Sequence, residues 1–279
     1  MVPQEACLPH ADRDWPCVTD CDARIRRTGL SRDKDENGHD DTPMQVFTYL
    51  LIVFSLAFPC LLQAATTSND QVIFTVDFSH QPPGTALPWL KENGFSFWLD
   101  AYRLNPRFEN HALVLSTDGR AAGMIGKQFK SGEYIHHVKR VRIEWGVDQY
   151  PVGADWENGI NRVPIAVVLT FGTKKWRSGI FPGFQPSPYF LSPFIGFKEE
   201  EGKQYVGKYY RKGGRYYCVA SGDRAGQTII TDFEVDDRFK RAFAEPATPP
   251  ITSFAFQMNT KDTLGGAKAF LRKIEFLAK

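Results

Sequence analysis

The sequence predicts an all-β domain over residues 66–279, with the architecture of a jelly-roll-like β-sandwich. Three observations predict it. Short apolar segments with the two-residue alternation of β-strands recur along this part of the chain, separated by turns rich in glycine and proline. Long helices do not alternate with these strands, which is typical of a sandwich or a barrel. The hydrophobic content of 42% and the aromatic content of 14% supply enough apolar surface for a packed core.

Residues 1–43 precede this domain and are predicted to be a disordered head. They carry 6 Lys and Arg and 10 Asp and Glu residues, a net charge of −4, and few apolar side chains. Three cysteines lie here, Cys7, Cys17 and Cys21, but no second Cys/His pair has a ligand spacing, so we predict no metal. We interpret Met44 as the natural start, which makes the head the product of a misplaced start codon.

The uncharged segment MQVFTYLLIVFSLAFPCLLQAA, residues 44–65, predicts export from the cytoplasm. Pro59 breaks a helix shortly before Ala64 and Ala65, the kind of small residues that a signal peptidase prefers. We therefore expect a cleaved signal peptide and a periplasmic or secreted domain. The alternative is a retained anchor in the inner membrane through residues 46–65, a stretch long enough to span a bilayer.

Past this segment the charge and the cysteine content change. Residues 66–279 carry 28 Lys and Arg and 22 Asp and Glu residues, a net of +6, and a single cysteine, Cys218. One cysteine excludes an intrachain disulfide, and we expect this thiol to be buried and inert. The composition has no break, which indicates one domain. The net charge of the whole chain, +2, gives no reason to expect binding to nucleic acid.

In the first half of the domain, alternation and apolar runs define the strands. The predicted strands are residues 71–78, 112–116, 139–147 and 163–171. The third alternates most clearly and places Val141, Ile143, Trp145 and Val147 on one face. The fourth is apolar on both faces, as expected of a central strand. Before the third strand, His136 and His137 are predicted to be a surface pair.

In the second half, turn residues delimit the elements. Residues 181–194, with four prolines, are predicted to form a long ordered loop. Residues 204–210 and 215–220 flank Gly213–Gly214 and predict a β-hairpin. The remaining predicted strands are residues 228–235, 251–258 and 267–277, the last of them pairing with the first strand of the domain. Residues 236–243 predict one short helix.

The segment EWGVDQYPVGADWENGINR, residues 144–162, is the candidate binding site, because carboxylates stand among aromatic residues there. Aromatic rings stack on the apolar faces of sugars, and carboxylates accept hydrogen bonds from sugar hydroxyls. The candidate ligand-binding residues are Trp145, Asp148, Tyr150, Asp155, Trp156, Glu157 and Arg162.

Three other interpretations of this segment stay open. Asp148 with Asp155 or Glu157 is a candidate acid–base pair for glycoside hydrolysis. The same oxygens are candidate ligands of a structural Ca²⁺, although we predict no cofactor. Finally, the aspartates stabilise turns and the tryptophans fill the core, without any ligand.

Signatures of common enzymes are missing from the sequence. It contains no GxSxG, HExxH, GxxxxGK[ST] or GxGxxG motif. The aromatic and basic segment 208–219 is compatible with single-stranded nucleic acid, but exported proteins rarely meet RNA, so we expect no nucleic-acid partner.

In the segment EWGVDQYPVGADWENGINR, and in GKYYRKGG and MNTKDT, the chain resembles a bacterial family of secreted proteins, domain of unknown function 3047. The resemblance spans most of residues 72–279 and implies a secreted β-sandwich. It implies no catalytic role for any residue.

These observations favour an exported, non-enzymatic domain that binds a polysaccharide or another component of the cell envelope. The first alternative is a glycan-active enzyme that uses the carboxylate pair. The second is a structural protein of the envelope without a small ligand.

Overall fold

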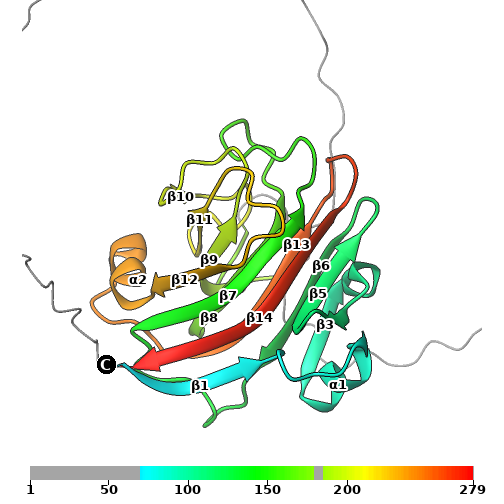
Figure 1. The fold of residues 1–279 in the computed structure, drawn as a ribbon. Helices are drawn as coiled ribbons and strands as arrows, with labels where there is room; N and C mark the ends of the chain where they lie inside the picture. The colour runs from blue at the N-terminus through cyan, green and yellow to red at the C-terminus, as the bar shows by residue number, and fades with distance from the viewer. Residues whose placement is uncertain (1–69, 179–184, 279) are drawn as a thin grey trace, which may run out of the picture. The chain divides into compact units, whose positions relative to one another are not determined.

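Two β-sheets face each other in the computed structural model, which describes residues 70–178 and 185–278 (Figure 1). This arrangement confirms the predicted β-sandwich. The predicted head, residues 1–43, and the apolar segment 44–65 lie outside the described residues. Over the described ranges, no helix has the length and apolar character needed to cross a membrane.

The first sheet, sheet A, contains seven strands. Its order is β12 (Ile229–Glu234), β7 (Arg140–Gln149), β14 (Ala267–Ala278), β5 (Ala112–Thr117), β4 (Arg107–Glu109) and β2 (Gly84–Thr85), with β1 (Gln71–Asp77) also paired to β14. All these pairs are antiparallel.

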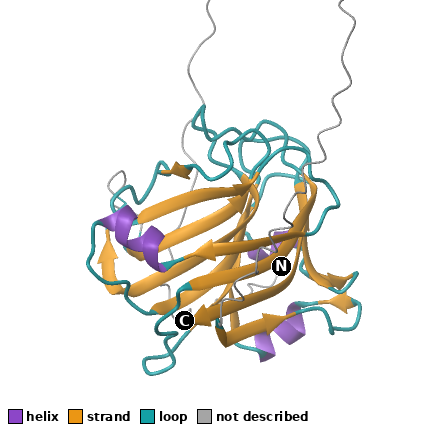
Figure 2. Ribbon diagram, turned by 60° about the vertical axis from the view of Figure 1, so that its left-hand side comes forward, coloured by secondary structure: helices purple, strands orange, loops and turns teal. Residues whose placement is uncertain are grey.

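The second sheet, sheet B, also contains seven strands. Its order is β10 (Gln204–Tyr205), β11 (Gly214–Ala220), β9 (Ser187–Ile195), β8 (Val163–Trp176), β13 (Ile251–Asn259), β6 (Ala122–Gln128) and β3 (Phe95–Leu99). Only the pair of β11 and β9 is parallel. The short helices are α1 (Leu87–Glu92), the 3₁₀ helix η1 (Ala101–Leu104) and α2 (Asp236–Phe243). Figure 2 shows α2 beside the strands, with loops gathered at one end of the sandwich.

The core lies between the sheets, as the alternation in β7 predicts. The four apolar side chains of that strand are all fully buried: Val141, Ile143, Trp145 and Val147. Phe254 and Phe256 of β13 enter the same core from sheet B. Because the core takes every second side chain of β7, the intervening charged residues lie on the outer face of sheet A.

The last strand, β14, holds sheet A together. One of its edges pairs with β7 from Lys268 to Leu277. Its other edge pairs first with β5 and then with β1, the first strand of the domain. In Figure 1, β7 and β14 run side by side along the front of the sandwich. The predicted pairing of first and last strands is confirmed.

Two predicted elements differ from the structure. The predicted loop 181–194 contains strand β9 from Ser187 onward. The aromatic and apolar side chains of this segment favour a strand despite its two prolines. Residues 181–184 lie outside the described part. The predicted hairpin is only two residues long in its first strand, β10. Beyond β10 the chain leaves the sheet, and the carbonyl of Tyr210, at φ +56°, accepts hydrogen bonds from the N–H groups of Gly213 and Gly214.

The sequence gives little indication of β6, because two glycines interrupt its apolar pattern. Both glycines lie where other backbone segments come close. A Cβ at Gly123 would meet the backbone of Ala101, and one at Gly126 would meet the backbone of Phe254 and Ala255. Tertiary packing, which local alternation does not report, requires glycine there.

Candidate functional site

The seven residues predicted as a binding site do not share one surface. Trp145 lies in the core between the sheets with no exposed area, and its Nε1–H donates to Thr231 Oγ1 at 3.0 Å. Its ring is therefore enclosed on both faces and gives a ligand no surface for stacking.

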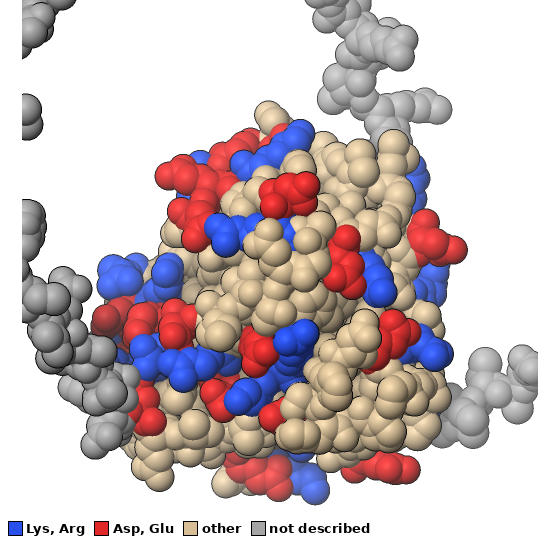
Figure 3. Space-filling view, in the orientation of Figure 1, with Lys and Arg blue, Asp and Glu red and all other residues tan. Residues whose placement is uncertain are grey.

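Asp148 lies at the end of β7, on the outer face of sheet A. Its Oδ2 is 3.6 Å from Lys268 Nζ, and the same ammonium lies 3.7 Å from Glu109 Oε2. These three side chains line a small cavity of about 130 Å³ whose floor includes Val114 and Phe270. Figure 3 shows acidic and basic side chains intermixed on this face of the molecule.

Trp156 lies in the loop between β7 and β8 and is packed on the outer side of sheet B. Its ring stacks on Phe194, with 4.9 Å between ring centroids, and contacts Tyr216 at 4.7 Å. Only 7% of the residue is exposed. Its backbone N–H donates to the buried carboxylate of Glu199, which also accepts the N–H groups of Phe197 and Lys198. Trp156 and Glu199 thus join two loops.

The carboxylates beside Trp156 are occupied by local partners. Asp155 accepts hydrogen bonds from the backbone and side chain of Asn158, which lower its pKa. Glu157 accepts hydrogen bonds from Lys203 Nζ at 2.8 Å and from the Tyr205 hydroxyl at 2.7 Å, and these bonds lower its pKa. Both groups are therefore ionised at neutral pH and tie loops together.

The last two predicted residues point in other directions. Tyr150 is half-buried against Phe197, with 5.1 Å between ring centroids, and burial raises its pKa. The Arg162 guanidinium donates to the Lys261 carbonyl and to the Asp262 carboxylate. Nowhere in residues 70–178 and 185–278 do three or more His, Cys, Asp or Glu side chains meet in a group that could hold a metal ion.

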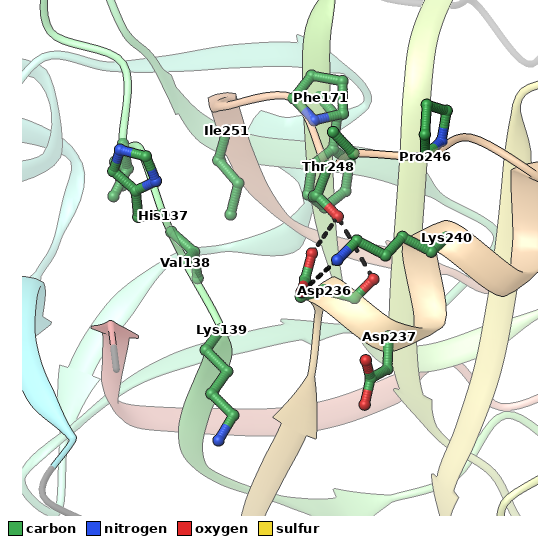
Figure 4. A pocket seen from close by; sticks show the side chains of 13 residues that line it. His137, Val138, Lys139, Phe171, Asp236, Asp237, Lys240, Pro246, Thr248 and Ile251 are labelled. Atoms are coloured by element: carbon green, nitrogen blue, oxygen red, sulfur yellow. Dashed lines mark hydrogen bonds and ion pairs between the residues drawn. The ribbon is translucent and has the colours of Figure 1, made fainter.

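A larger cavity lies beside α2, at one end of the sandwich, and it is the candidate functional site (Figure 4). Its volume is about 500 Å³, within the range of small-molecule binding sites. The segment before β7, the start of β13, helix α2 and the segment that follows this helix enclose it. Its floor is apolar and consists of Ile135, Val138, Phe171 and Ile251.

Polar side chains form the rim of this cleft. Asp236 accepts hydrogen bonds from Lys240 Nζ at 2.8 Å and from Thr248 Oγ1 at 2.6 Å. Burial raises the pKa of Asp236, but the bonds from Lys240 and Thr248 outweigh this effect and bring the pKa below its ordinary value. Asp236 is thus a fixed anion that holds the helix against the segment after it.

Two other charges on the rim are free to meet a ligand. Lys139 and Asp237 have no hydrogen-bond or ion-pair partner for their side chains among the described residues. In Figure 4 both side chains lie at the lower rim of the cleft, apart from the Asp236–Lys240 pair. His137 is exposed on the wall that faces α2, and its backbone has the left-handed conformation, with φ +58° (Figure 4). The cleft can therefore offer a donor and an acceptor at once.

The sequence predicts two elements that line this cleft, but not the cleft itself. Helix 236–243 and the histidine pair are both predicted, and the structure shows both histidines exposed. They are about a hundred positions apart in the chain, so only the tertiary structure brings them to one cavity. The one local signal is the pair Asp236 and Asp237 in the first turn of the helix, and acidic residues there also stabilise a helix N-terminus without any ligand.

No protein-family model and no curated protein sequence matches this chain. Three solved structures match this chain with low similarity. A family 29 carbohydrate-binding module from Piromyces equi, CBM29_1, is 10% identical, with 74% of this chain and 91% of that chain covered and a TM-score of 0.33. The K2 cleaved adhesin domain of Lys-gingipain is 12% identical, with 73% and 98% covered and a TM-score of 0.33. The catalytic domain of Humicola grisea Cel12A is 16% identical, with 68% and 89% covered and a TM-score of 0.35. At this level of similarity, the three structures assign no function to this chain.

Proposed function

We propose that this β-sandwich is a non-catalytic binding domain for a polysaccharide or another component of the cell envelope, and that the cleft beside α2 holds the ligand. The proposal also places the domain outside the cytoplasm, as the apolar segment 44–65 suggests.

One observation supports this function best: the unpartnered Lys139 and Asp237 on the rim of a cleft with an apolar floor. A sugar ring has hydroxyl groups, which both donate and accept hydrogen bonds, and C–H faces, which favour apolar contact. A rim with one cation and one carboxylate meets the first requirement, because hydrogen bonds to charged groups are the stronger kind. The floor at Val138 and Ile251 meets the second.

The test is a glycan-array screen of the purified full chain, with and without EDTA. We expect binding that EDTA does not remove. In the Asp237→Asn and Lys139→Gln variants, the Kd for the best glycan should rise about tenfold, which corresponds to the loss of one charge-assisted hydrogen bond.

Two control variants make the result specific. Asp118→Asn and Lys212→Gln change one charge each at exposed positions that do not line the cleft, and they should bind like the original chain. Silence of the folded protein across a broad array would overturn the proposal. Loss of binding in EDTA would instead favour the Ca²⁺ interpretation.

A further inference from the structure

Arg238 is a half-buried cation whose guanidinium forms no ion pair with the described residues. It lies on α2, and its guanidinium carbon is 4.7 Å from the ring centroid of Tyr217 and 5.0 Å from that of Phe233. The two rings fix the plane of the guanidinium but accept none of its hydrogen bonds in the ordinary sense. In the part of the chain that the structure describes, no side chain or backbone group forms a hydrogen bond or an ion pair with it.

Arg215 lies on β11 and is tied to the C-terminal end of α2. Its guanidinium donates to the carbonyls of Arg211 at 2.7 Å and Ala242 at 3.3 Å, and it lies 5.1 Å from the Phe243 ring centroid. Carbonyl oxygens accept hydrogen bonds but carry no net charge, so these contacts orient Arg215 without neutralising it. Burial lowers the pKa of both Arg215 and Arg238, as expected of charges held out of water.

Arg241 completes the cluster. It is three residues after Arg238 on α2, a spacing that puts both side chains on one side of the helix. Burial raises the pKa of the Tyr217 phenol, and the positive charges of Arg238, Arg215 and Arg241 oppose that rise. All three charges therefore act on one hydroxyl. Basic side chains gather at the position of α2 on the left of Figure 3, with acidic ones below them.

The acidic residues nearby have other partners or other directions. Glu234 Oε1 lies 3.7 Å from Arg140 Nη1, and Glu245 accepts the hydroxyl of Tyr189 at 2.9 Å. Asp236 binds Lys240, and Asp237 lines the cleft and forms no ion pair with these arginines. The charge of Glu234 acts on Arg238, but no carboxylate of the described residues forms an ion pair with any of the three guanidinium groups.

We propose that Arg215, Arg238 and Arg241 form a binding site for an anionic oxygen group, the carboxylate, phosphate or sulfate of a ligand. A planar guanidinium donates two parallel hydrogen bonds to such a group, and here two aromatic rings already hold one guanidinium in place. The ordering cost of binding is correspondingly small. This site is separate from the cleft beside α2, and it does not depend on the function proposed for that cleft.

Isothermal titration of the full chain with inorganic phosphate, and separately with an oligogalacturonate, tests this site. We expect binding of at least one probe, weakening as salt is added because the attraction is between charges. The Kd should rise about tenfold in Arg241→Gln, which removes an exposed charge, and at least as much in Arg238→Met. Arg238→Lys keeps the charge but not the planar arrangement of donors, so its affinity should lie between that of the original chain and that of Arg238→Met.

Arg120→Gln is the matched control, because it removes one exposed positive charge that is not part of this cluster. It should bind both probes like the original chain. Binding of phosphate alone would identify a phosphate-type ligand, and binding of the oligogalacturonate a carboxylate-bearing one. The site is overturned if neither probe binds, or if Arg120→Gln weakens binding as much as Arg241→Gln does. Asp237→Asn should leave these titrations unchanged, which separates this test from that of the cleft.

Discussion

How much a single aromatic residue contributes to the stability of this domain depends on which side chains pack against its ring. Trp156 has Phe194 on one side and Tyr216 and Tyr205 around it, so nearly all of its apolar area is withdrawn from water. Tyr102, in contrast, is 58% exposed and stacks on a single ring, that of Phe97. The two residues should respond very differently to truncation.

Trp156→Ala should lower the free energy of unfolding by about 3–5 kcal/mol, because it leaves a cavity between three rings. Urea unfolding followed by circular dichroism measures this change. Tyr102→Ala is the control and should cost about 1 kcal/mol. If Trp156→Ala instead keeps its stability but loses glycan binding, Trp156 is a ligand platform, as one of the sequence-based hypotheses holds.

At the scale of single residues, the sequence predicts burial better than it predicts roles. The alternation in β7 correctly places Val141, Ile143 and Val147 in the core, and Cys218 is buried as expected. The same alternation places Trp145 in the core, yet its aromatic character also favours a ligand site. Type and burial do not separate a stacking platform from a core residue, because only the surrounding side chains decide.

At the scale of elements, two carboxylates, one buried and one exposed, hold the loop between β7 and β8 against the segment between β9 and β10. Glu199 receives three backbone N–H groups from two loops, and Glu157 links the segment before β8 to Lys203 and Tyr205 near β10. The second link is exposed and therefore depends on pH and salt.

Glu157 should make this link sensitive to acid. The hydrogen bonds from Lys203 and Tyr205 lower the pKa of Glu157 below its ordinary 4.5 in the folded chain. A carboxylate of this kind stabilises the fold above its unfolded pKa, and the stabilisation is lost as the pH falls through the folded pKa. The original chain should therefore have a higher melting temperature than Glu157→Gln at neutral pH, with a difference that shrinks below pH 4.5.

Glu92→Gln serves as the comparison, since it removes the same charge from an exposed helix residue. Its melting temperature should follow that of the original chain at every pH. A difference between the original chain and Glu157→Gln that stays constant down to pH 3 would contradict the assigned pKa shift.

The elements that the sequence predicts are those whose pattern is sufficient by itself. β7, β13 and β14 alternate or are apolar over most of their length, β8 is apolar up to Phe171, and helix α2 has its predicted bounds. β6 is missed because close backbone packing at Gly123 and Gly126, and not alternation, selects its residues. The cleft is missed for a related reason: its floor joins Val138 to Phe171 and Ile251, residues that only the assembled sheets bring together.

At the scale of the whole molecule, the fold depends on its last strand. β14 contributes an edge to β7, to β5 and to β1, and its inward side chains include Ile274 and Phe276, both fully buried. Without it, β1 has no partner and sheet A is divided between β7 and β5.

A chain that ends at Gly266 should therefore not reach the folded state. Near-ultraviolet circular dichroism and a thermal melt should show no fixed aromatic environment and no cooperative transition. The control is a chain without residues 1–43, which should melt like the original, because these residues are predicted to contribute nothing to the core. A cooperative melt of the chain ending at Gly266 would show that β14 is dispensable.

The position of β14 also sets an order in time. A ribosome makes the chain from its N-terminus, so β14 emerges after the other strands of both sheets, and β1 waits for a partner about two hundred residues further along the chain. Until β14 has emerged, the chain cannot complete sheet A. If the domain is exported, as proposed above, this delay is an advantage, because a folded sandwich would not pass through a narrow translocation pore.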